Sequence, residues 1–135
     1  VEVNAYERLP GDGYLEYVKP FRTIEDIHVI GAALAYLMGL SRRTRSSKTL
    51  IAELSADLSA LDRLRDGHPL DPRVHIALHG VHRRVMRLVG DPAFAAVLEA
   101  APPDERARWE RDRALLRVAS KARDARFERA AKELA

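Results

Sequence analysis

Apolar residues recur every three or four positions along most of this chain, which is the spacing of one face of an α-helix. Between residues 23 and 41 this face carries Ile27, Ile30, Leu34, Leu37 and Leu40. Equivalent stripes cover residues 48–65, 72–89 and 92–99. The segment after Asp104 is long enough for one further helix of about 30 residues, or about 45 Å. The pattern therefore predicts an all-α protein.

The breaks between these stripes carry helix start signals. The sequence Thr-Ile-Glu-Asp at residues 23–26 resembles a capping box, in which the Thr23 hydroxyl caps the first turn. Asp71 and Asp91 are each followed by proline, the arrangement of an N-cap before the first helical residue. Serines in the connector 41–47 can cap the helix that follows. The sequence thus predicts an up-and-down bundle of four to five helices.

The first 22 residues lack this helical period. Residues 1–3, Val-Glu-Val, alternate apolar and polar side chains as the end of a strand does, and residues 9–13 are typical of a turn. Three aromatic residues, Tyr14, Tyr17 and Phe21, follow the turn. We therefore divide the chain into a strand remnant and interdomain connector at residues 1–22 and a helical bundle domain at residues 23–135.

Length, charge and cysteine content narrow the class of protein. The chain has 135 residues, enough for one domain with its own core, and it has no cysteine. It contains no apolar run as long as a membrane span and no secretory leader, so we expect a cytoplasmic protein without a membrane partner. The formal net charge is +3, and acidic residues alternate with the basic ones. This mixture is typical of solvated helices and disfavours a nucleic-acid partner, although an arginine-mediated nucleic-acid binder stays open as a third interpretation.

Three histidines share one stripe of the helix predicted at residues 72–89. His75, His79 and His82 have the spacing H-x3-H-x2-H, which can bring imidazoles together on one metal ion. No nearby cysteine or carboxylate completes the set, and the glutamate of an H-E-x-x-H motif is missing. We therefore expect no metal site and interpret these residues as surface or subunit-boundary histidines, with metal binding as the alternative.

Two charged groups are candidate functional residues. The densest basic cluster lies beside the start of the helix 48–65, where cations and free N–H groups can hold a phosphate. It consists of Arg42, Arg43, Arg45 and Lys48, of which the three arginines are the candidates. Glu25 and Asp26 form a carboxylate pair that can divide acid and base chemistry. The alternatives are a solvated basic cluster and two acids that favour the helix dipole. Motifs of serine or cysteine hydrolases and of dinucleotide-binding folds are absent from the sequence.

The leader and the first helix resemble one point in the acyl-CoA dehydrogenases, where the central β-barrel domain joins the C-terminal helical domain. The resemblance rests on Val1-Glu2-Val3, on Gly11 to Tyr14, on Glu25-Asp26 and on Gly31-Ala32-Ala33. The number and order of the predicted helices also resemble that C-terminal domain. The family's motifs for binding FAD and for the catalytic base are missing from this chain, so the resemblance is to a divergent member.

This resemblance implies a role in FAD-dependent dehydrogenation of an acyl-CoA in fatty-acid metabolism. It implies Glu25 as the catalytic base, and Arg42, Arg43 and Arg45 as cofactor-binding residues. The chain would be a helical scaffold and subunit interface of a homo-oligomer, inactive alone because the N-terminal and β-barrel domains of the same polypeptide complete the pockets for FAD and acyl-CoA. The aromatic residues of the leader would pack against those domains. The alternative is a non-enzymatic helical oligomerisation or protein-binding module.

Overall fold

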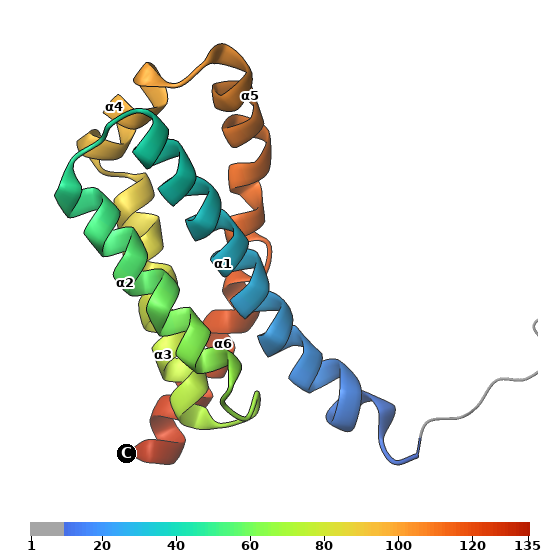
Figure 1. The fold of residues 1–135 in the computed structure, drawn as a ribbon. Coiled ribbons are helices and arrows are strands. Elements are labelled where there is room, and N and C mark those ends of the chain that lie inside the picture. The colour runs from blue at the N-terminus through green and yellow to red at the C-terminus, as the bar shows by residue number, and fades with distance from the viewer. Residues whose placement is uncertain (1–9) are drawn as a thin grey trace, which may run out of the picture.

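The computed structural model describes residues 10–135, and every regular element in this part of the chain is helical. Six α-helices are joined by short turns (Figure 1). They are α1 (Lys19–Arg43), α2 (Lys48–Arg65), α3 (Pro72–Val89), α4 (Pro92–Ala100), α5 (Pro103–Asp112) and α6 (Ser120–Leu134). A π-helical turn, η1 (Tyr14–Val18), leads into α1, and a 3-10 turn, η2 (Arg113–Arg117), joins α5 to α6.

The helices form one bundle. Figure 1 shows α1, α2 and α3 running up and down beside one another, with α5 along α1 and α6 crossing at the lower end. Helix α1 packs mainly against α2, and α3 packs against both α2 and α6. The prediction of an all-α bundle is confirmed.

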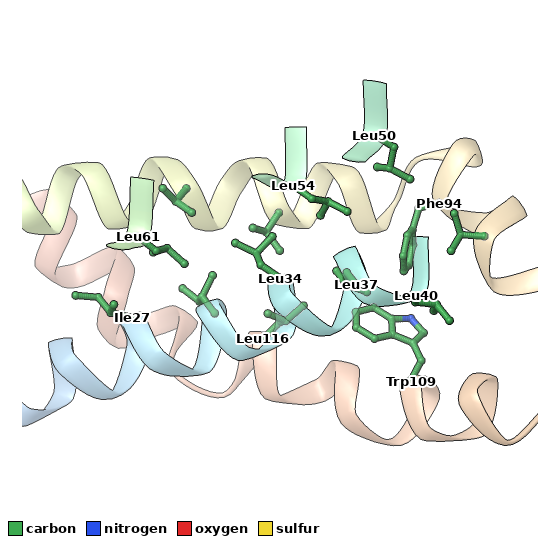
Figure 2. Packing of buried hydrophobic residues seen from close by; sticks show 14 of the residues in the cluster. Ile27, Leu34, Leu37, Leu40, Leu50, Leu54, Leu61, Phe94, Trp109 and Leu116 are labelled. Atoms are coloured by element: carbon green, nitrogen blue, oxygen red, sulfur yellow. The ribbon is translucent and has the colours of Figure 1, made fainter. Parts of the chain in front are cut away.

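The core forms from the predicted apolar stripes (Figure 2). Ile30, Leu34 and Leu40 of α1 are fully buried, and they meet leucines of α2 and valines of α3. Trp109 closes the upper end of the core, where the edge of the Phe94 ring lies against it at a centroid distance of 5.4 Å. Aromatic contacts of this geometry add to the free energy gained by burying the rings.

Three of the predicted helix starts are confirmed. The Ser47 side chain accepts a hydrogen bond from the backbone N–H of Leu50, at 3.2 Å, and so caps α2. Asp71 and Asp91 accept hydrogen bonds from backbone N–H groups in the first turns of α3 and α4, each at 2.8 Å. Each cap satisfies a donor that the helix itself leaves unpaired.

The prediction that the first helix begins at Thr23 is wrong. Helical structure starts at Tyr14, and the carboxylate of Asp12 accepts the N–H groups of Tyr14 and Leu15 at 2.9 and 3.1 Å. Pro20, which has no backbone N–H to donate, lies directly after this π-helical turn, in the first turn of α1. Thr23 is consequently a buried residue inside α1, with its hydroxyl 3.4 Å from Nε2 of His75. The part of the connector from Tyr14 onward is helical.

The prediction of one straight terminal helix is also wrong, because η2 interrupts it and separates α5 from α6. Trp109 and Leu116 are buried, whereas Leu134 is 49% exposed. The buried face of α6 carries Arg123 and Arg126.

Two further predictions concern a strand at residues 1–3 and the absence of an apolar run as long as a membrane span. The strand predicted at residues 1–3 lies outside the described residues. The continuous helix from Tyr14 to Arg43 is long and apolar enough, by length and composition alone, to cross a membrane. Core helices of soluble proteins pass the same test, and the Ile30 face of this helix is buried in the bundle.

Candidate functional site

A buried ionic cluster joins the start of α1 to α6. The carboxylate of Asp26 accepts a hydrogen bond from Nη2 of Arg123 at 3.1 Å and another from Nη2 of Arg126. All three side chains are less than a tenth exposed. Burial lowers the pKa of Arg126, and the charge of Asp26 acts in the opposite direction. One carboxylate therefore neutralises two buried guanidinium groups incompletely.

Arg123, one of the two arginines of this cluster, has N–H groups that donate no hydrogen bond to Asp26. Nε and Nη1 of Arg123 are buried and have no hydrogen-bond partner among the described residues. Buried donors of a charged group are costly to leave unpaired, so the position of Arg123 depends strongly on Asp26.

A cavity of about 720 Å³ lies beside this cluster. Its apolar wall comes from Val29 of α1, from Leu115, and from alanines of α6 such as Ala122. Its charged lining includes Glu25 and Arg126. The cavity is thus an apolar surface with carboxylates and guanidinium groups at one side.

The two adjacent carboxylates have different roles in this structure. Asp26 is held between two arginines. Glu25 is 42% exposed at the side of the cavity, where Nη1 of Arg22 contacts its Oε2 atom at 3.2 Å. Of the two, only Glu25 has a carboxylate open to a molecule in the cavity. It is therefore the better candidate for a proton acceptor.

The predicted cofactor-binding arginines lie at the opposite end of α1. Glu25 and Arg42 are 17 residues apart on one continuous helix, which corresponds to about 25 Å. Nη2 of Arg43 contacts Oε1 of Glu105 at 3.3 Å. Arg45 follows the end of α1 with a positive φ of 54°, in the left-handed region. The structure does not bring these arginines together with Glu25.

The three histidines of α3 contact three different partners. Nε2 of His75 donates to the carbonyl of Pro69 at 2.9 Å, and Nε2 of His82 donates to the carbonyl of Leu116 at 2.8 Å. The ring of His79 stacks on Phe127 at a centroid distance of 4.1 Å. Within residues 10–135, no group of three histidine, cysteine or acidic side chains is placed to hold a metal ion. These rings therefore have structural partners of their own.

Arg123 and Arg126 could not be recognised from the sequence around them, because interleaved acidic and basic residues are typical of a solvated helix. A signal for them exists on α1. Asp26 shares its helical face with Thr23, Ile27 and Ile30, so a carboxylate stands in the middle of a buried stripe. Such a charge requires a buried cationic partner.

No family model, curated protein or solved structure matches this chain.

Proposed function

We propose that this chain is the helical scaffold and subunit-interface domain of an acyl-CoA dehydrogenase-like flavoprotein. The observation that carries the proposal is the exposed apolar surface of η1 and the first turns of α1. These turns extend beyond the rest of the bundle (Figure 1). We call residues 14–24 the arm. Its exposed side chains are Tyr14 at 64%, Leu15 at 49%, Tyr17 at 38%, Val18 at 43%, Phe21 at 57% and Ile24 at 42%.

The arm is too apolar to be explained as ordinary surface. An aromatic side chain buries about 150 to 250 Å² when it is covered. The exposed fractions of Tyr14, Tyr17 and Phe21 therefore leave roughly 300 Å² of aromatic surface in water. An exposed patch of this size, on consecutive turns of one helix, is typical of an interaction surface. This surface supports a scaffold role with an interface on the arm.

The finer assignment concerns Glu25 and the cavity beside it. In a dehydrogenase of this kind, a carboxylate removes a proton from the α-carbon of an acyl thioester, and the bound flavin accepts the hydride. Glu25 has the required carboxylate oxygens at the side of an apolar cavity large enough for an acyl chain. We propose that Glu25 accepts this proton, while Asp26 and its arginines hold the start of α1 in place.

The fit of FAD to this chain rests on the basic end of α1. Arg42 and Arg45 are exposed, and among the described residues no carboxylate lies within 4.0 Å of either. Exposed guanidinium groups without a carboxylate partner are suited to binding a diphosphate. Since about 25 Å of helix separates them from Glu25, we propose that Arg42, Arg43 and Arg45 contact the cofactor of a neighbouring subunit.

The test compares the whole parent protein with its Glu25→Gln variant. We expect the purified parent to carry FAD, and its flavin to be bleached by an acyl-CoA thioester under anaerobic conditions. Glu25→Gln should keep the flavin and slow bleaching by 100-fold or more, since positioned acid–base groups contribute about 10²- to 10⁴-fold. Asp12→Asn is a matched control outside the cavity, and it should bleach at the rate of the parent. Equal rates for Glu25→Gln and the parent would contradict the role of Glu25.

The second candidate is a non-enzymatic helical oligomerisation or protein-binding module. The same exposed arm favours it, because this role needs a docking surface and no cofactor. It predicts a colourless parent that takes up no added FAD but still self-associates or binds a partner through the arm.

A further inference from the structure

We propose that the arm binds a second copy of this chain, in a symmetric dimer whose two α1 helices run antiparallel. Each arm would lie in the groove between α1 and α2 of the other copy. This inference rests on the subunit-interface role proposed above and names its surface.

The arm and the groove lie on the same side of one helix. Phe21, Ile24 and His28 follow one another at spacings of three and four residues, and Ala35 lies seven residues after His28. Positions with this spacing share one helical face. The buried face of α1, with Ile30 and Leu34, points to the other side. One exposed face therefore carries large apolar side chains in its first half and the groove in its second half.

The groove itself has a volume of about 670 Å³. Its lining is mainly apolar and includes Gly31 and Ala35 of α1 and Leu58 and Leu61 of α2. A methyl group built on Gly31 would meet its nearest neighbour, Cδ1 of Leu61, at an ordinary 3.9 Å. The missing side chain at Gly31 consequently leaves the floor of the groove low.

A twofold axis places the arm of each copy against the groove of the other. If the axis passes between Ile24 and His28, then Phe21 of one copy faces Gly31 of the other, and Tyr17 faces Ala35. The large side chains of each arm then meet the small residues of the other groove. Because a twofold interface repeats every contact, both arms are covered at once and no unpaired arm remains to recruit further copies.

The surface available is large enough for a stable dimer. The three aromatic rings and Ile24 of one arm expose roughly 400 Å². Covering both arms and the surface of both grooves buries roughly 1,000 Å² in total, which is about the threshold for a specific interface.

The first test measures the mass of the 135-residue chain by sedimentation and light scattering. The protein concentration runs from about 1 to about 100 µM, the range in which a dimer of micromolar affinity forms. We expect a species of twice 15.2 kDa. Phe21→Glu on the arm and Ala35→Arg in the groove should each weaken dimerisation at least ten-fold. The matched controls are Leu134→Glu and Ala77→Arg, which place the same charges at exposed positions away from this face, and both should leave the mass unchanged.

The second test fixes the antiparallel register. The chain has no cysteine, so the double variant Tyr17→Cys with Ala35→Cys contains only the two introduced thiols. They lie 18 residues apart on one helical segment, about 27 Å, which is too far for a disulfide within one copy. Oxidation should therefore give a covalent dimer, and Tyr17→Cys with Ala77→Cys should not.

The two proposals fail separately in these tests. A chain that stays monomeric at about 100 µM would overturn the proposed dimer. A dimer that keeps its mass in both Phe21→Glu and Ala35→Arg would overturn it too. Neither result affects the flavin assay of the parent. A monomeric chain whose arm instead binds the remaining domains of its own polypeptide would also overturn the proposed dimer. A colourless parent would contradict the flavoprotein proposal without changing the mass expected here.

Discussion

The guanidinium of Arg123 donates a hydrogen bond to the carboxylate of Asp26 at 3.1 Å, across 97 residues of chain. This contact ties the start of α1 to α6, the first long helix of the described chain to the last. It forms inside the protein, where both side chains are shielded from water. The geometry of the candidate site at Glu25 therefore depends on a residue more than 90 positions away.

We predict that Asp26→Asn destabilises the fold strongly. The substitution keeps the size of the side chain but leaves the two buried arginines without a counter-charge. Breaking a buried ion pair in this way costs about 3 to 5 kcal/mol. Urea unfolding followed by circular dichroism measures the loss. Glu25→Gln removes a carboxylate from an exposed pair and should cost no more than about 1 kcal/mol, so equal losses for the two variants would contradict this account.

His82 makes the stability of the fold depend on pH. Burial lowers the pKa of His82 from its ordinary 6.5, and the Leu116 carbonyl opposes this effect. The unfolded chain therefore binds a proton that the folded chain resists, and stability should fall as the pH drops below about 7. Thermal unfolding between pH 8 and pH 5 should show this slope. His82→Gln, whose amide can still donate to Leu116, should flatten the slope, although His75 shifts in the same direction and keeps part of it.

Tyr36 provides a second titration test, at high pH. Burial and its hydrogen bond to Oε2 of Glu105, at 2.6 Å, raise the pKa of Tyr36 to about 12. The folded chain holds this phenol proton above pH 10, so the contribution of Tyr36 to stability should decline as the pH rises beyond 10. Absorbance at 295 nm, a standard ultraviolet wavelength for tyrosinate, follows the ionisation. Tyr36→Phe should remove the step near pH 12, and a titration curve that keeps this step would contradict the assignment.

Truncating Trp109 should damage the core. Its ring is 3% exposed and packs on Phe94 and Tyr36. Trp109→Ala should cost about 3 to 5 kcal/mol, because it leaves a cavity among these rings. Leu134→Ala is the control: Leu134 is 49% exposed and should change stability by less than about 0.5 kcal/mol. A similar loss at both positions would mean that α6 packs through its last turn as well.

The sequence predicted most of the bundle because its signals are local. Caps such as Asp71 and Asp91 act within one turn, and the apolar stripe of α1 repeats within one helix. Helical structure begins nine residues before the predicted start at Thr23, because the capping residue Asp12 lies in a segment whose composition is typical of a turn. Thr23 is instead buried, and its hydroxyl lies near Nε2 of His75, which is 52 residues away in the sequence.

The candidate site was harder to predict for the same physical reason. Asp26 and Arg123 lie 97 residues apart, and they become partners only through the packing of α6 near the start of α1, which no local pattern encodes. Glu25 was identified as a candidate from its place in the sequence. Its position at the side of a cavity follows from the packing of η2 and α6 against α1. The distance between Glu25 and Arg42 required the continuous helix to be known.

The most direct measurement is the visible absorption spectrum of the purified parent protein, recorded before and after anaerobic addition of acyl-CoA thioesters. The proposed function predicts a flavin spectrum that bleaches when a thioester of suitable chain length is added. A colourless protein that also fails to take up added FAD would contradict the flavoprotein proposal and favour a purely structural or binding role for the bundle.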